Sequence, residues 1–276
     1  MSEDLNPLAL LKGLADPARL LLHPQARGQG VRVAIVDTGV DRVALAQTLP
    51  ARTGQHLVAE ALLFDRHGQP RSAGDLFSAP HGTTVAHIVL LLAPEAELYS
   101  ADVFAGAGTA SLEAVIAALD YARSHWRCHL VNLSLGITEE QLQLPARRRE
   151  LVRAIEACYY QDVLVVAAAH NMHPIVRSYP AVYSAPLVSV DKGPFEQAME
   201  FAYVLREQIE FQAHARGYLG PFADTPATSW AAAHLTGLIA RLLSLQPGLK
   251  PFEVKTLLYW MSQTRRRWAE HKDPSG

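Results

Sequence analysis

Three residues of the chain have side chains that together could form a serine nucleophile, and each lies in a short run of its own. Asp37 belongs to the run DTG, His81 to HGT and Ser229 to ATSWAAAH. In such a triad the serine hydroxyl attacks a carbonyl carbon, the histidine takes its proton, and the aspartate fixes the imidazole tautomer. The same chemistry occurs on unrelated folds in different chain orders, so the order Asp, His, Ser also carries information about the fold.

The sequence around each residue predicts the element that would hold it. Residues 31–36 form an apolar run, typical of a buried strand, which ends at Asp37 and a turn glycine. His81 and Ser229 each open an apolar helical run. Both would therefore project from helix starts, where backbone N–H groups are unpaired and the dipole favours developing negative charge. Taken singly, the three residues also suit a turn, a core polar group and a helix N-cap, but their ordered occurrence favours the triad.

The coarse pattern of the chain predicts an α/β fold. Strand-like runs lie at residues 31–36, 98–104, 130–135, 163–168 and 187–190, and they alternate with helical patterns at 85–92, 112–122, 148–160 and 231–245. Such alternation is typical of a mostly parallel central sheet with helices on both faces. The least readable stretch is 191–226, where 195–206 favours a weak helix and 209–217 favours a strand and turn. Catalytic groups in these folds lie at the carboxyl ends of the strands.

These runs are joined by VNLSLG at residues 131–136, VVAAAHN at 165–171, YPA at 179–181 and a closing helix at 253–261. In kind and order, over nearly the whole chain, they resemble the motifs of the subtilase family of serine peptidases. The resemblance implies a subtilisin-like three-layer α/β fold. It also implies a serine endopeptidase that hydrolyses peptide bonds through an acyl-enzyme on Ser229, with a peptide or protein as substrate.

The resemblance also assigns roles around the triad. Asn171 matches the asparagine whose side chain joins the backbone N–H of Ser229 as an oxyanion hole. The residues matched to substrate binding are Gly108, Thr109 and Ala110 on a strand beside the substrate backbone, and Ser134, Leu135, Gly136, Ala169 and His170 around the pocket. Ordinary sheet and turn structure is the alternative for both groups, and a left-handed turn is the alternative for Asn171. With Ala168 in its wall, Ser178 at its base and no acid expected there, the pocket is predicted to favour a medium or large apolar residue.

Departures from the family pattern leave two alternatives to a general endopeptidase. His170 stands where the family usually has glycine, and Ala227 replaces the glycine before the Thr-Ser pair. Because glycine serves where backbones approach closely, both changes affect the pocket wall. The alternatives are a pseudoenzyme that binds an extended peptide without cutting it, and a maturation peptidase dedicated to one precursor or partner.

Composition excludes several other classes of function. The net charge is −2, with 25 Lys and Arg against 27 Asp and Glu, so no field of one sign favours nucleic acid or a membrane surface. Cys128 and Cys158 lack metal-ligand spacing and are predicted to be buried free thiols. The insertion that often binds calcium in the family is missing after Leu92, so we expect no metal and no cofactor.

The ends of the chain complete the expectations. We expect an N-terminal extension at residues 1–30, a peptidase domain at 31–265 and a tail at 266–276. Charged residues, Gly13 and Pro17 interrupt the N-terminal apolar stretch, unlike a signal peptide, which favours a cytoplasmic location. About thirty residues before the first strand are too few for an inhibitory pro-domain, so the chain resembles intracellular subtilases. An inhibitory or activating protein partner is then one way in which activity would be restrained.

Overall fold

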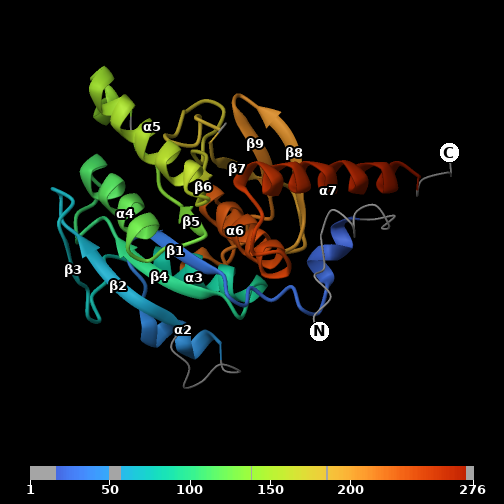
Figure 1. The fold of residues 1–276 in the computed structure, drawn as a ribbon, viewed down its shortest axis with the longest axis horizontal. Helices are drawn as coiled ribbons and strands as arrows, with labels where there is room; N and C mark the ends of the chain where they lie inside the picture. The colour runs from blue at the N-terminus through green and yellow to red at the C-terminus, as the bar shows by residue number, and fades with distance from the viewer. Residues whose placement is uncertain (1–16, 50–56, 138, 185, 272–276) are drawn as a thin grey trace.

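The computed structural model describes residues 17–49, 57–137, 139–184 and 186–271, and within them one sheet crosses the molecule (Figure 1). Its strands are β1 (Arg32–Asp37), β2 (Val58–Phe64), β3 (Pro70–Ser72), β4 (Glu97–Asp102), β5 (Leu130–Leu133), β6 (Leu164–Ala168), β7 (Val188–Lys192), β8 (Phe201–Arg206) and β9 (Ile209–Ala213). Their order is β3-β2-β4-β1-β5-β6-β7-β9-β8. Neighbours from β2 to β9 in this order run parallel, while β3 and β8 close the two edges as antiparallel strands.

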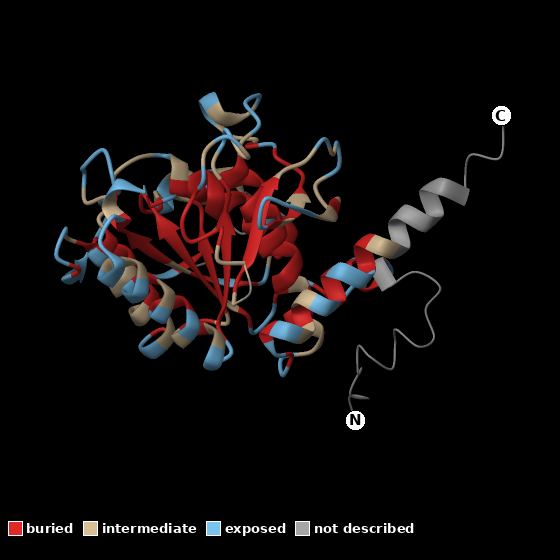
Figure 2. Ribbon diagram, turned by 90° about the horizontal axis from the view of Figure 1, so that it is seen from above, coloured by how far each residue is buried: buried red, intermediate tan, exposed pale blue. Residues whose placement is uncertain are grey.

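Helices cover both faces of the sheet, which gives three layers. They are α2 (Arg42–Thr48), α3 (His81–Leu92), α4 (Leu112–Ser124), α5 (Pro145–Tyr160), α6 (Thr228–Leu245) and α7 (Pro251–His271), with short 3₁₀ turns η1 (Pro17–Leu22), η3 (Glu140–Leu142) and η4 (Gly220–Phe222). Helices α4 and α5 pack on one face, whereas α3 and α6 pack on the other. Figure 2 shows the central strands of the sheet coloured as buried. Helix α7 begins against the same cluster as α6 and runs beyond residue 265, where the peptidase domain was expected to end.

The strands bury both of their faces, as parallel sheets between helices require. In β1, Val33 and Ile35 point into the cluster shared with α3 and α6, while Ala34 and Val36 point into the cluster shared with α4 and α5. All four are fully buried, because successive strand side chains alternate between faces and each face has its own helical cover. Cys128 and Cys158 are free and buried in the second cluster, as predicted.

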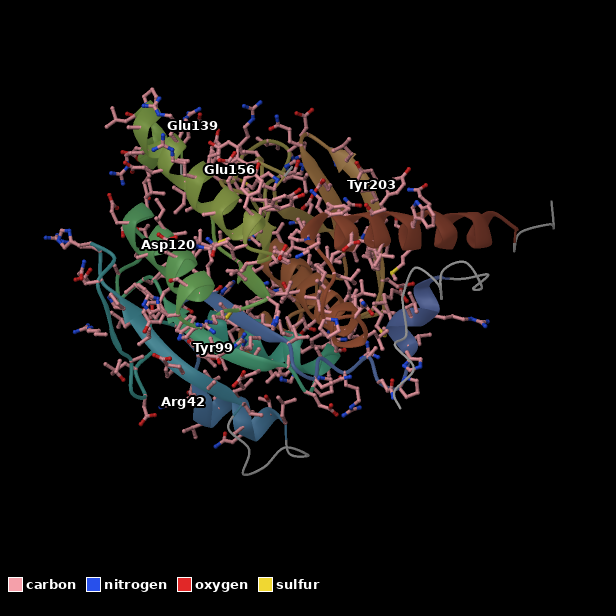
Figure 3. The ribbon with its side chains drawn as sticks, viewed as in Figure 1. Arg42, Tyr99, Asp120, Glu139, Glu156 and Tyr203 are labelled. Atoms are coloured by element: carbon pink, nitrogen blue, oxygen red, sulfur yellow. The ribbon has the colours of Figure 1, made fainter. Side chains whose placement is uncertain are left out.

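Most of the predicted elements are confirmed, and the errors lie at the sheet edges. The strand runs correspond to β1, β4, β5, β6 and β7, and residues 209–217 contain β9. The weak helix predicted at 195–206 is wrong, because Phe201–Arg206 is β8. This edge strand owes its conformation to distant partners: it pairs with β9, and Tyr203, labelled in Figure 3, packs edge-on against Tyr259 of α7 with ring centroids 4.9 Å apart. Local sequence does not reveal such contacts.

Candidate active site

Asp37 and His81 meet at the carboxyl edge of the sheet. Asp37 ends β1 and is 1% exposed, and His81 is the first residue of α3. His81 Nδ1 lies 2.8 Å from Asp37 Oδ1, which also accepts the Thr38 N–H at 2.7 Å. Because a carboxylate accepts here, Nδ1 carries the proton and Nε2 remains the basic nitrogen. This is the tautomer that a general base needs.

The electrostatics of His81 combine two opposed effects. Burial of the ring lowers the pKa of His81, whereas the negative charge of Asp37 and the hydrogen bond to it raise that pKa. The two contributions of Asp37 outweigh burial, so the net pKa lies above the ordinary value of 6.5. Asp37 therefore favours the imidazolium that forms when His81 accepts a proton.

The start of α3 is capped from the neighbouring turn rather than from within the helix. Pro80, the N-cap residue, makes no side-chain cap. Instead Thr38 Oγ1 accepts the Gly82 N–H at 3.0 Å and donates to the Ala79 carbonyl at 2.7 Å. A Cβ on Gly82 would lie 2.2 Å from the Gly39 carbonyl oxygen. Glycine at position 82 is thus what lets the helix of His81 approach the turn of Asp37.

Ser229 lies in the first turn of α6 and is 7% exposed. Its Oγ donates to the Ser134 carbonyl oxygen at 3.2 Å, at the end of β5. In the described part of the chain no hydrogen bond joins Ser229 Oγ to His81, whose ring lies tilted against that of the next residue, Trp230. Donation to His81 Nε2 therefore requires the hydroxyl to leave the Ser134 carbonyl. Catalytic hydrogen bonds that form only with substrate are common in unliganded enzymes.

Asn171 caps α6 in the way that Thr38 caps α3. Ala227, the N-cap residue, has no side-chain cap, and Asn171 Oδ1 accepts the Thr228 N–H at 2.9 Å and the Thr228 hydroxyl at 3.2 Å. These two donors fix the orientation of the amide and leave Nδ2 as its donor, and Asn171 and Ser229 both line one cavity. The Ser229 N–H belongs to the same helix start, where amides lack an intrahelical acceptor. The pair has the chemistry of an oxyanion site.

A cavity of about 770 Å³ adjoins Ser229. Its lining brings together most of the expected substrate-binding residues: Ser134, Leu135, Gly136, Ala168, Ala169, His170, Asn171, Ser178 and Ser229. Ser178 lies so close to Gly136 that a Cβ there would stand 2.4 Å from its hydroxyl oxygen. A side chain at position 136 would therefore clash with Ser178, so the close approach of these two residues requires glycine.

Gly108, Thr109 and Ala110 are placed differently from the expectation. They are not among the residues that line this cavity, and they lie in the loop between β4 and α4 rather than in a strand. Within the described residues no neighbouring backbone pairs with them as a ladder, and a strand conformation depends on such pairing. The expected strand is therefore a loop in the structure.

Charged side chains at the cavity also differ from the expectation. Glu139, Arg177 and Glu207 contribute to its lining, so the prediction that no acid lies there is wrong. Glu139, labelled in Figure 3, accepts Arg148 Nη2 at 2.8 Å, which pairs its charge. Glu207 comes from the turn between β8 and β9. Both acids come from connections outside the recognisable motifs, and no sequence signal placed them beside Ser229.

A buried polar network supports the nucleophile from behind. Asn132 Nδ2 donates to Thr236 Oγ1 at 3.0 Å, which links β5 to α6, and Ser134 Oγ lies 2.7 Å from Asn132 Oδ1. His234, one turn after Trp230, is fully buried and donates from Nδ1 to the Trp230 carbonyl at 2.7 Å. Burial lowers the pKa of His234 to about 3, so this histidine stays neutral and structural.

The described residues contain no group of three or more His, Cys, Asp or Glu arranged to hold a metal ion. Among the helices of the described chain, none has the length and apolar character needed to cross a membrane.

Comparisons with known proteins agree with this architecture. Residues 28–192 match the model of the subtilase family. The M-protease of Shouchella clausii (strain KSM-K16) is 26% identical over 246 residues, a match that covers 84% of this chain and 58% of that protein. Subtilisin Savinase of Lederbergia lenta is also 26% identical over 246 residues, covering 84% of this chain and 82% of that protein.

Solved structures support the fold. The S41 psychrophilic protease superposes with a TM-score of 0.66 at 21% identity, over 83% of this chain and 82% of that one. Sphericase superposes with a TM-score of 0.65 at 22% identity, over the same shares of the two chains. The family match covers more than half of the chain, and the sheet, the helix starts and the Asp37–His81 pair agree with it. The chain belongs to the subtilase family and has the subtilisin-like fold.

Proposed function

We propose that the chain is a serine endopeptidase that hydrolyses peptide bonds through an acyl-enzyme on Ser229. The observation that carries the proposal is the 2.8 Å hydrogen bond between His81 and Asp37, which prepares a basic Nε2 close to the helix start that bears Ser229. Relatives at 26% identity that carry the names M-protease and Subtilisin Savinase support the same activity.

The chemistry follows from the positions of the donors and acceptors. His81 Nε2 takes the hydroxyl proton as Ser229 Oγ attacks the scissile carbonyl, and Asp37 stabilises the imidazolium. The carbonyl oxygen becomes an oxyanion that accepts from Asn171 Nδ2 and from the Ser229 N–H. His81 then protonates the leaving amine. In the second half of the reaction His81 takes a proton from water, the water attacks the acyl carbon, and His81 returns the proton to Ser229 Oγ as it leaves.

The cavity supports a preference for a medium or large apolar residue before the scissile bond. Ala168 and Ala169 are buried in its wall, the carboxylate of Glu139 is already paired with Arg148, and Glu207 is exposed to solvent in the turn between β8 and β9. We propose that the loop at residues 108–110 pairs with the extended substrate backbone only after binding, by β-augmentation. A peptide library would contradict the pocket assignment if cleavage followed Lys or Arg predominantly.

One observation favours a second candidate, a scaffold that binds an extended peptide without cutting it. The Ser229 hydroxyl donates to Ser134, not to His81, and a scaffold has no need of the alternative arrangement. His170 and Ala227 also favour the scaffold, because both replace glycines of the family pattern next to the site. His170 lines the cavity, and Ala227 directly precedes α6.

Labelling with a serine-directed fluorophosphonate separates the two candidates. A peptidase should react at Ser229 in the wild type, and Ser229→Ala should abolish both labelling and peptide hydrolysis. Ser72→Ala is the matched control, because Ser72 is exposed on the edge strand β3. A wild-type protein that binds peptide but does not react with the probe would overturn the peptidase proposal and leave the scaffold.

A further inference from the structure

The imidazole of His81 lies against the indole of Trp230. The two ring centroids are 4.7 Å apart with an interplanar angle of 35°. Trp230 directly follows Ser229 in α6 and is 2% exposed. Asp37 thus holds one edge of the imidazole, while Trp230 covers one face.

Trp230 is itself held in a single orientation. Its Nε1–H donates to the Thr225 carbonyl at 3.1 Å, and its own carbonyl accepts from His234 Nδ1 at 2.7 Å. Phe222 packs against the indole with centroids 5.2 Å apart and presents an edge-on contact to His81 at 6.0 Å. The aromatic surface that meets His81 is therefore rigid, and its geometry does not depend on a mobile side chain.

We propose that Trp230 is a positioning residue for His81, which holds the imidazole over the start of α6 and stabilises its protonated form during proton transfer. This inference rests on the proposed peptidase function. An aromatic face carries partial negative charge, and a cation within about 6 Å of the ring centroid is attracted to it. The imidazolium exists only after His81 has taken a proton, so the attraction is stronger in the transition state than in the resting state.

A purely structural role for Trp230 predicts a different outcome. Trp230 belongs to the apolar cluster between the sheet and α6, and a core residue would act on stability alone. A positioning role would also change the pKa of His81 and the turnover number. Among the described residues, Asp37 is the charged group that acts on the pKa of His81, so a change on altering Trp230 would not be confused with a second charge.

The test compares Trp230→Leu with Trp230→Phe. Leucine keeps the site apolar but removes the aromatic face, whereas phenylalanine restores that face. Trp126→Leu is the matched control, because Trp126 is also buried, donates from Nε1 to Glu60 and lies in the cluster on the opposite face of the sheet. For each folded variant the pKa of His81 is measured by NMR titration of the imidazole, and kcat and KM are measured on a peptide.

Trp230→Leu should lower the pKa of His81 by about half a unit to one unit and lower kcat roughly tenfold, with a smaller change in KM. Trp230→Phe should recover most of both effects, and Trp126→Leu should change only stability. An unchanged His81 pKa in folded Trp230→Leu, or a phenylalanine variant no better than leucine, would overturn the inference.

A second measurement covers the case in which Trp230→Leu does not fold. Fluorinated tryptophans keep the shape of the indole while weakening the negative charge of its face, so the pKa of His81 should fall stepwise with fluorine content. Trp230 is the tryptophan in ring contact with His81 among the described residues, which makes the reading local. No dependence on fluorine content would also overturn the inference. Because the titration needs no turnover, a protein that fails fluorophosphonate labelling yet shows this dependence would lose only the proposed activity.

Discussion

Ser134, which directly follows β5, and Ser229 of α6 contact each other twice, each through its hydroxyl and the other's carbonyl. The Ser229 hydroxyl donates to the Ser134 carbonyl at 3.2 Å, and the Ser134 hydroxyl lies 3.1 Å from the Ser229 carbonyl. The single proton of Ser134 is shared with Asn132 Oδ1 at 2.7 Å. The sheet therefore fixes the backbone of the nucleophile and also holds its hydroxyl in the resting state.

We predict that Ser134→Ala lowers both stability and turnover. It leaves a buried amide oxygen and a buried carbonyl without this donor, at a cost of about 1–3 kcal/mol in the free energy of unfolding. Urea denaturation and kcat measure the two effects. Ser189→Ala is the control, because Ser189 is fully buried in β7 and its hydroxyl accepts the Glu210 N–H at 2.9 Å. It should lose stability alone, and an unchanged kcat in Ser134→Ala would contradict the prediction.

Asn171 combines two roles that one substitution can separate. In Asn171→Asp a carboxylate oxygen still accepts the Thr228 N–H, and negative charge is favourable at a helix start, so the melting temperature should be kept. The amide donors are lost, so turnover should fall by about a hundredfold to a thousandfold, roughly 3 to 4 kcal/mol. Asn171→Ala should lose the same activity and about 1 kcal/mol of stability besides. An active aspartate variant would remove Asn171 from the oxyanion site.

The dependence of rate on pH follows from the raised pKa of His81. Neutral His81 is the base, so kcat/KM should rise with pH through a midpoint above 6.5. In Asp37→Asn the lowering effect of burial remains without its opposing charge, so the pKa of His81 should fall below 6.5. Imidazole NMR titration of both proteins measures the difference. A rate that does not change between about pH 5 and 8 would exclude a histidine base.

The triad and the core strands could be predicted from the sequence because both are local patterns. Asp37 follows an apolar run, and His81 and Ser229 open helices, which is where the structure has them. The strand runs that became β1, β4, β5, β6 and β7, together with the helical patterns between most of them, were sufficient to predict a mostly parallel sheet with two covered faces, whereas β2 and β3 were not predicted. These features need no knowledge of which distant residues touch.

The parts that sequence missed depend on long-range contacts. Thr38 caps the helix of His81 from 44 residues away, and Asn171 caps the helix of Ser229 from 57 residues away. Neither N-cap residue, Pro80 or Ala227, caps its helix with its own side chain, and Ser229, which suits an N-cap by residue type, lies inside α6, so local N-cap signals do not reveal these contacts. Trp230 likewise reads as a core residue until its ring is seen against His81.

We expect Arg241 to stabilise the region after Leu92, where the family resemblance places a calcium-binding insertion. Its guanidinium, from α6, donates to the Leu21 carbonyl of η1 and to the Leu92 carbonyl at the end of α3, both at 2.6 Å. A cation at a helix C-terminus that satisfies two carbonyl groups stabilises the joint between three segments. The helix that bears His81 is thereby tied to the N-terminal turn without a metal ligand.

We therefore predict that Arg241→Met lowers the free energy of unfolding by about 2–3 kcal/mol, since hydrogen bonds to charged groups are the stronger ones. The melting temperature should fall by about 4–12 °C, while a calcium chelator should leave that of the wild type unchanged. Arg27→Met is the matched control, because the nearby Arg27–Glu95 pair is about half exposed and such pairs contribute little. A large fall on adding chelator would show that a cation, and not Arg241, holds this joint, because the guanidinium contacts do not depend on free metal.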